Sequence, residues 1–178
     1  MQKQVIIING TGGSGKDTFV QYCSEYAKVI NISSVDKVKE AATILVGWKG
    51  EKDEKSRKLL VDLKKLSIDY NDAPLKYIEK QYNAFLNSQA EYLFIHIREI
   101  DEIKKIKKFL NAKTLLVTNP RVKLITTNSS DANVYKYEYD YYIENAGPLE
   151  DVERKAKECI SGIKKTLFFL GEFLRLPD

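Results

Sequence analysis

A glycine-rich run near the amino terminus has the residue types and the spacing of a phosphate-binding loop. The run Gly10-Thr11-Gly12-Gly13-Ser14-Gly15-Lys16 fits the pattern G-x-x-x-x-G-K. Glycines tolerate positive φ, so such a run can turn successive backbone N–H groups toward a bound anion. Lys16 can then reach the β- and γ-phosphates of a nucleoside triphosphate as a mobile positive charge. We predict nucleotide contacts from Gly10, Gly12, Gly13, Ser14, Gly15 and Lys16, and a catalytic role for Lys16.

The two residues after this loop depart from the usual pattern. Asp17 stands where most such loops carry a serine or threonine whose hydroxyl ligates magnesium, and Thr18 comes one position later. A carboxylate near a triphosphate is repelled unless it faces a metal, a bound water or the acceptor hydroxyl, or caps the helix end. We predict Asp17 and Thr18 as nucleotide contacts and candidate metal ligands. A catalytic role and a purely structural role for Asp17 both stay open.

Phosphoryl transfer also needs positive groups around the γ-phosphoryl oxygens, and the chain has only five arginines. Arg98 follows a strand-like run, at the edge where open α/β sheets bind ligands, and its forked guanidinium suits an acceptor phosphate. We predict that Arg98 is catalytic and binds the acceptor; a salt bridge with Glu99 or Asp101 is the alternative. Arg121 is predicted to be a catalytic arginine that arrives when a loop closes, or else a solvated loop residue.

Four further side chains are candidates for binding the acceptor. Asp36 could orient a hydroxyl, and Lys39 lies beside it on the same predicted helix. Arg57 could reach the acceptor or could pair with an acid on its own helix. His96, the only histidine, could bond an acceptor group or a metal-bound water, although a histidine satisfied at a strand end is the more common case.

Hydrophobic patterning assigns these residues to alternating strands and helices. The predicted strands are 5–9, 29–32, 92–97, 114–117 and 139–143. The predicted helices include 17–28, 35–45, 74–87 and 98–110, a helix capped by Asp53 with Leu59, Leu60, Leu63 and Leu66 on one face, and a last helix opened by Pro148. Ser33 or Ser34 is predicted to cap the second helix. This alternation predicts a single α/β domain over 1–178, with a parallel sheet covered on both faces.

Finer packing expectations follow from the same patterns. In the 98–110 helix, we expect an inward face of Ile100, Ile103, Ile106, Phe109 and Leu110. The alternation of Tyr135, Tyr137, Tyr139 and Tyr141 predicts one face of an extended strand. The apolar segment 167–176 is expected to pack on the body or on a second subunit.

Composition narrows the class of protein. With 178 residues, 43% hydrophobic and 30% charged, the chain has the balance of a soluble globular protein. No apolar run approaches ~20 residues, and no signal-peptide pattern is present, so we expect a cytoplasmic protein without membrane partners. The net charge of +4 suits anionic small molecules without indicating nucleic acid. Cys23 and Cys159 have no metal-type or disulfide-type spacing, and the oligomeric state is open.

Four segments together resemble the deoxynucleoside monophosphate kinases and animal-type phosphomevalonate kinases, within the nucleoside monophosphate kinase group of P-loop folds. Gly15-Lys16-Asp17-Thr18 is the G-K-D-T form of the loop, and Val38-Lys39-Glu40 resembles the L-K-E segment on the acceptor side. Ile97-Arg98 resembles the end of the D-x-R motif. The run 140–147 resembles D-x-x-I-x-N-x-G, which follows the adenine region in these kinases and in dephospho-CoA kinases.

This resemblance implies a P-loop NTPase-type three-layer fold, with a five-stranded parallel sheet in the order 2-3-1-4-5. It implies ATP with Mg²⁺ as donor, an acceptor-binding helical region at about 33–88, and a lid at about 118–133. Asn145 and Gly147 would then shape the adenine pocket. Two features depart from the family: His96 replaces the aspartate of D-x-R, and the lid carries only Arg121 and Lys123.

The sequence therefore predicts an ATP-dependent kinase that phosphorylates a nucleoside monophosphate or a similar phosphorylated small molecule. The alternative is a catalytically weak or inactive nucleotide-binding regulator on the same scaffold, favoured by the two departures. A GTPase would need N-K-x-D after the fourth strand, where the chain has Thr118-Asn119-Pro120-Arg121.

Overall fold

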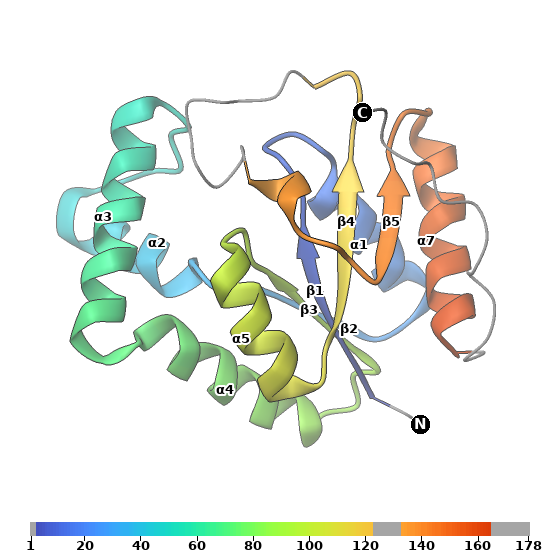
Figure 1. Ribbon diagram of the computed structural model, residues 1–178, viewed down its shortest axis with the longest axis horizontal. Helices are drawn as coiled ribbons and strands as arrows, with labels where there is room; N and C mark the ends of the chain where they lie inside the picture. The colour runs from blue at the N-terminus through green and yellow to red at the C-terminus, as the bar shows by residue number, and fades with distance from the viewer. Residues whose placement is uncertain (1–2, 123–132, 165–178) are drawn as a thin grey trace.

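A five-stranded parallel sheet forms the centre of the computed structural model, which describes residues 3–122 and 133–164 (Figure 1). The strands are β1 Gln4–Asn9, β2 Val29–Ser33, β3 Tyr92–His96, β4 Lys113–Thr118 and β5 Tyr141–Glu144. Their order is β2-β3-β1-β4-β5, and each neighbouring pair is parallel. The predicted α/β fold and strand order are confirmed.

β1 lies at the middle of the sheet because its side chains are apolar on both faces. Val5 to Ile8 are all buried, as expected for a strand covered by helices on each side. Ile8 pairs with His96 of β3, and Asn9 pairs with Leu116 of β4. The carboxyl ends of these three strands therefore meet at one edge of the sheet, where the glycine-rich loop begins.

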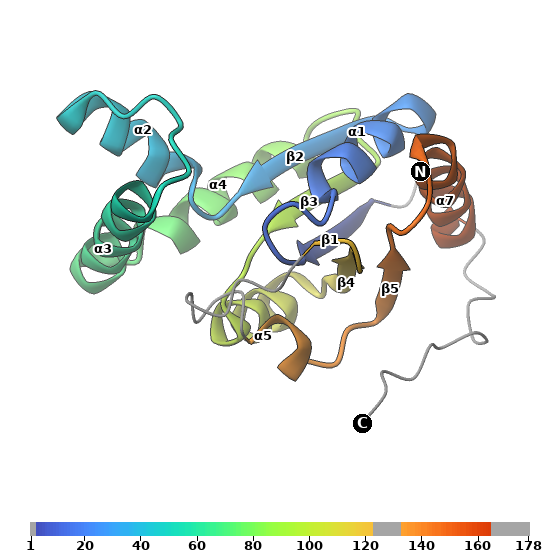
Figure 2. The same ribbon diagram turned by 90° about the horizontal axis from the view of Figure 1, so that it is seen from above.

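Helices cover both faces of the sheet. On one face, α1 Lys16–Tyr26 and α7 Leu149–Lys164 pack together over a core that includes Phe19, Phe94 and Ala156. On the other, α4 Ala73–Leu86, α5 Ile100–Leu110 and the 3₁₀ turn η1 Val134–Lys136 enclose a second core. Figure 2 shows α1 and α5 on opposite sides of the sheet.

Two helices between β2 and α4 project away from the sheet. They are α2 Asp36–Val46 and α3 Glu54–Asn71, and Figure 2 shows both beyond the carboxyl end of β2. Several of their large apolar side chains are exposed, including Ile44, which is 82% exposed, and Leu66. These helices lie within the region 33–88 that the family resemblance associates with the acceptor.

The helix starts follow the sequence signals with one exception. The Asp53 carboxylate accepts a 2.7 Å hydrogen bond from the Ser56 N–H and caps α3, as predicted. Pro74 lies in the first turn of α4, also as predicted. The predicted serine cap of α2 is wrong, because Val35 occupies that position without a side-chain bond. Instead, Asp36 of the first turn accepts a 2.7 Å bond from the Ser33 N–H.

Two packing predictions are wrong. Phe109 is 55% exposed, because the buried face of α5 follows Ile103, Ile106 and Leu110, and Phe109 lies off that face. The tyrosine-rich run does not form one extended strand: it begins in η1, and β5 starts only at Tyr141. Val134 and Tyr139 are instead buried against the core. The predictions for Lys123 and for 167–176 lie outside the described residues.

Three further features are the two cysteines, possible metal-binding clusters and possible membrane-spanning helices. Cys23 and Cys159 are both free thiols. Over 3–122 and 133–164, the side chains form no cluster of three or more histidine, cysteine or acidic residues that could hold a metal ion. In the same ranges, no helix combines the length and the apolar character needed to cross a bilayer.

Candidate functional site

The glycine-rich loop connects the end of β1 to the start of α1 through backbone conformations that glycine favours. Gly10 has a φ of +148° and Gly15 a φ of +89°. A Cβ atom on Gly10 would collide with the Val117 carbonyl, and one on Gly15 would collide with the Asn145 amide. Glycine at these two positions thus allows neighbouring strands to approach the loop closely.

Lys16 lies over the loop that precedes it. Its ammonium donates hydrogen bonds to the carbonyls of Gly10 at 2.7 Å and Thr11 at 2.8 Å, and to the Ser14 hydroxyl at 3.4 Å. Lys16 is also the first residue of α1, whose N-terminus carries partial positive charge. The side chain and the helix end together make this turn a site suited to an anion.

Two asparagines hold the loop at its two ends. The Asn9 side chain accepts a 2.7 Å hydrogen bond from the Gly10 N–H. The Asn145 side chain donates a 3.0 Å bond to the Ser14 carbonyl, and its backbone N–H donates to the Thr118 carbonyl at 2.7 Å. Sequence reasoning included Asn145 but missed Asn9. Asn9 could have been identified from the sequence because it is a polar residue at the end of an otherwise apolar strand.

His96 lies beside the loop at the end of β3. Its Nε2 is 2.9 Å from Asn31 Oδ1 and 3.8 Å from Asp17 Oδ1, and its side chain is only 14% exposed. Burial lowers the pKa of His96 from 6.5 to about 4, so the ring is uncharged near pH 7. The charged neighbours that act on this ring are Asp17, Lys16, Asp36 and Lys39. Five of the predicted site residues are thereby brought together.

The members of this group differ in how they are held. The Asp17 side chain is 93% exposed on the first turn of α1. Asp36 bonds the Ser33 N–H and accepts from the Tyr77 hydroxyl at 3.4 Å. Asp36 therefore stabilises the turn between β2 and α2, whereas the Asp17 carboxylate is accessible to a ligand.

The three predicted site arginines are all exposed but lie in different places. Arg98 lies two residues after the end of β3, and its carbonyl accepts a bond from the Asn9 side chain at 3.3 Å. Arg121 precedes Val122, whose methyl groups lie 3.6–3.7 Å from a Cβ placed on Gly13. Arg121 thus lies in a segment that covers the loop. Arg57 lies in the first turn of α3, near its capping residue.

Gly147 lies at the junction between β5 and α7. A Cβ atom there would lie 2.8 Å from atoms of the Asp151 side chain, so the absence of a side chain lets α7 begin close to the strand end. Asp151 pairs with Lys155 at 2.7 Å, and Lys155 also donates to the Glu144 carbonyl at 2.6 Å. Close packing between β5 and α7 therefore explains why a glycine occupies position 147, without involving a ligand.

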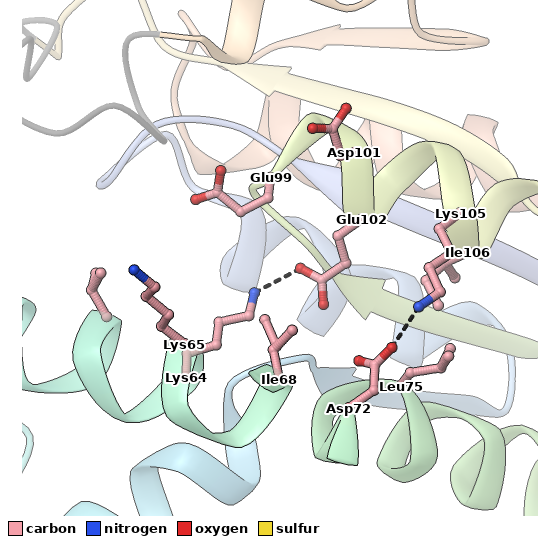
Figure 3. A pocket seen from close by; sticks show the side chains of 11 residues that line it. Lys64, Lys65, Ile68, Asp72, Leu75, Glu99, Asp101, Glu102, Lys105 and Ile106 are labelled. Carbon is pink, nitrogen blue, oxygen red and sulfur yellow. Dashed lines mark hydrogen bonds and ion pairs between the residues drawn. The ribbon is translucent and has the colours of Figure 1, made fainter. Parts of the chain in front are cut away.

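A cavity of about 410 Å³ opens between α3, α4 and α5 (Figure 3). Its walls contain apolar side chains and charged ones; they include Val61, Ile68, Leu75 and Ile106, and Lys64, Lys65, Asp72, Glu99, Asp101, Glu102 and Lys105. Lys64 and Glu102 form a largely buried ion pair at 2.6 Å, and Lys105 pairs with Asp72. Since Glu99 comes three residues after the end of β3, one side of the cavity adjoins the carboxyl end of that strand. No local sequence pattern predicted this cavity, because its walls come from three helices.

Comparison with known proteins supports the fold. No protein-family model matches this sequence, and no curated protein matches it significantly. Among solved structures, a candidate kinase from Chloroflexus aurantiacus is 11% identical with a TM-score of 0.51, covering 94% of this chain and 100% of that chain.

Two further structures are similar over comparable lengths. TT1252 from Thermus thermophilus is 21% identical with a TM-score of 0.48, covering 92% of this chain and 99% of that chain. Shikimate kinase from Aquifex aeolicus is 15% identical with a TM-score of 0.48, covering 91% and 99%. At these identities the likeness concerns the fold alone: a five-stranded parallel sheet in the order β2-β3-β1-β4-β5 with helices on both faces.

Proposed function

We propose that this chain is an ATP-dependent kinase that transfers the γ-phosphoryl group to a small phosphorylated acceptor of the nucleoside monophosphate type. The observation that carries this proposal is the loop 10–16, held at both ends by Asn9 and Asn145, with the Lys16 ammonium above its carbonyls. The loop amides and Lys16 would bind the donor phosphates. The likeness to the Chloroflexus aurantiacus candidate kinase is consistent with this function.

Asp17 and Thr18 fit a magnesium site next to the loop. The Asp17 carboxylate is exposed on the first turn of α1, and oxygen ligands of this kind suit Mg²⁺. Mg²⁺ would neutralise charge on the donor phosphates. Asp17 and Thr18 would hold it directly or through water.

The acceptor would lie on the β2–β3 side of the loop. Arg98 would bind its phosphate, and Lys39 and His96 would contact it near the strand ends. The cavity between α3 and α5 would receive its organic part, so the acceptor would contact the predicted region 33–88 through α3 and also residues of α5. Arg121 would add positive charge beside the transferred group, and residues 123–132 of the predicted lid lie outside the described residues.

In the reaction, an acceptor oxygen forms a bond to the γ-phosphorus while the bond to the β–γ bridging oxygen breaks. ADP leaves with the electron pair of that bond. Because most of the required stabilisation is electrostatic, the main task of the chain is to place Lys16, Arg98 and Arg121 around the transferred group.

One observation favours a second candidate, a nucleotide-binding regulator without turnover. His96 is uncharged near pH 7 and occupies the place of the aspartate in D-x-R, so one carboxylate for the metal is missing. A weaker metal site would slow transfer more than it would weaken nucleotide binding.

A coupled assay of ADP release separates the two candidates. The acceptor panel contains nucleoside and deoxynucleoside monophosphates, dephospho-CoA and phosphomevalonate, and MgATP binding is measured in parallel by calorimetry. We expect turnover with one acceptor and loss of ATP binding in Lys16→Ala. The control is Lys28→Ala, an exposed lysine bonded to Gln89 away from the loop. MgATP binding without any turnover would favour the regulator, and no binding heat would refute both candidates.

A further inference from the structure

We propose that Asn9 is a positioning residue that holds the phosphate loop, the backbone at Arg98 and the 133–139 connection in one fixed arrangement, with Tyr139 as its partner. Its kinetic consequences rest on the proposed function, whereas the structural coupling does not. The side chain contacts all three segments although they are far apart in sequence.

The Asn9 side chain is fully buried, and its hydrogen-bonding capacity is used in three directions. Its oxygen accepts from the Gly10 N–H at 2.7 Å, and its NH₂ group donates to the Tyr139 hydroxyl at 2.8 Å and to the Arg98 carbonyl at 3.3 Å. A backbone N–H can face only the amide oxygen, and a backbone carbonyl can face only the NH₂ group. The three partners therefore fix the orientation of the amide.

Tyr139 extends this contact to the connection before β5. Its hydroxyl accepts from Asn9 and donates to the Val134 carbonyl at 3.0 Å. The ring is buried and lies edge-on to Tyr137, with centroids 4.9 Å apart, and to Tyr142 at 6.0 Å. Burial raises the pKa of Tyr139, which keeps the hydroxyl protonated and able to donate.

These contacts connect the parts of the site whose relative position matters most for transfer. Gly10 begins the donor loop, and Arg98 is the proposed acceptor ligand. A small displacement between the two would misalign the reacting groups, and such an error has a large effect on rate. A buried amide satisfied on three sides resists that displacement because each broken bond leaves a desolvated polar group.

Amide hydrogen exchange without nucleotide tests the coupling. In Tyr139→Phe, we expect the Gly10 and Lys136 amides to exchange about five- to tenfold faster, since one hydroxyl supports both segments. The matched control is Tyr92→Phe: Tyr92 is also buried and donates to the Ile160 carbonyl at 3.1 Å, but it lies at the start of β3. Faster exchange at Lys136 alone, or equal effects in both variants, would overturn the coupling.

The kinetic test uses the same variant. We expect Tyr139→Phe to lower kcat about fivefold and to raise the KM for the acceptor, while the Kd for MgATP changes by less than about threefold. Asn9→Ala should have a larger effect in the same direction. A lower melting temperature with unchanged kcat and KM would show a purely structural role. If the wild-type protein has no turnover with any acceptor, the proposed function fails, whereas the exchange result still decides the coupling.

Discussion

The Asn145 side chain donates a 3.0 Å hydrogen bond to the Ser14 carbonyl and so joins the end of β5 to the phosphate loop, across 131 positions of sequence. Replacing Asn145 with alanine removes this contact and leaves a partly buried carbonyl without that donor. We expect Asn145→Ala to weaken MgATP binding about tenfold and to lower the free energy of unfolding by about 1–2 kcal/mol. Calorimetry and urea unfolding measure the two effects. Asn87→Ala removes a similar 2.9 Å bond to the Asn83 carbonyl on α4, and it should leave MgATP binding unchanged.

Arg98 is predicted to act on the acceptor and not on the nucleotide. Arg98→Ala should raise the KM for the acceptor by about ten- to a hundredfold with little change in the Kd for MgATP, because a charged hydrogen bond is lost. Steady-state kinetics and calorimetry give the two values. Arg154→Ala is the control, since Arg154 pairs with Asp151 and Glu158 on α7. An unchanged KM in Arg98→Ala would assign the acceptor phosphate to another residue.

A larger side chain on α3 can fill the cavity between α3 and α5 and so test whether the acceptor binds there. Ile68 lines it and is partly exposed, so a larger side chain can enter without displacing the core. Ile68→Trp should raise the KM for the acceptor at least about tenfold and leave MgATP binding unchanged. Ile44→Trp, at an exposed position of α2, controls for added aromatic surface. Equal kinetics in both variants would exclude this cavity as the acceptor site.

Asp140 is expected to make folding stability depend on pH. It accepts 2.8 Å bonds from the Thr114 N–H and hydroxyl and pairs with Lys107 at 2.8 Å. Burial raises the pKa of Asp140, but the bonds from Lys107 and Thr114 outweigh burial and lower the pKa below 3.8. A carboxyl with a lowered folded-state pKa stabilises the fold above the unfolded value, and this contribution is lost as pH falls through the folded value.

Asp140→Asn should therefore lower the free energy of unfolding by about 1 kcal/mol near pH 7. Its stability should also fall less steeply than that of the wild type between about pH 5 and pH 2. Urea unfolding at several pH values measures both effects. Asp62→Asn, an exposed acid paired with Lys58 on α3, should follow the wild-type curve. Parallel curves for Asp140→Asn and wild type would contradict the assignment.

The sequence predicted the sheet well because the relevant signals are local. Val5 to Ile8 form a short apolar run before a glycine, and the same pattern of short strands and amphipathic helices recurs along the chain. Caps such as Asp53 also act over three or four residues. The inward face of α5 was wrong only at Phe109, because a helix that is apolar at many positions does not indicate which of them faces the sheet.

Less of the candidate site could be predicted, because its contacts join distant segments. Lys16 and Asp17 belong to a recognisable motif, but the partner of Asn9 is Tyr139, 130 positions away. The alternation of tyrosines from Tyr135 to Tyr141 predicted an extended strand, so the 3₁₀ turn at Val134–Lys136 was not predicted. Asp140 belongs to the run 140–147 that resembles a kinase motif, but its carboxylate accepts a hydrogen bond from the Thr114 N–H at the start of β4 and so stabilises the sheet.

The strand order has a consequence for how the chain acquires its shape during synthesis. β1 leaves the ribosome first, yet both of its neighbours come much later: Gln4 is aligned with Tyr92, and Ile8 with Leu115. This buried strand must therefore remain without its sheet partners until β3 and β4 have been synthesised. Such distant pairing slows folding and prolongs the exposure of aggregation-prone surface. Nascent chains that end before β3 should consequently depend on chaperones far more than the full-length protein does.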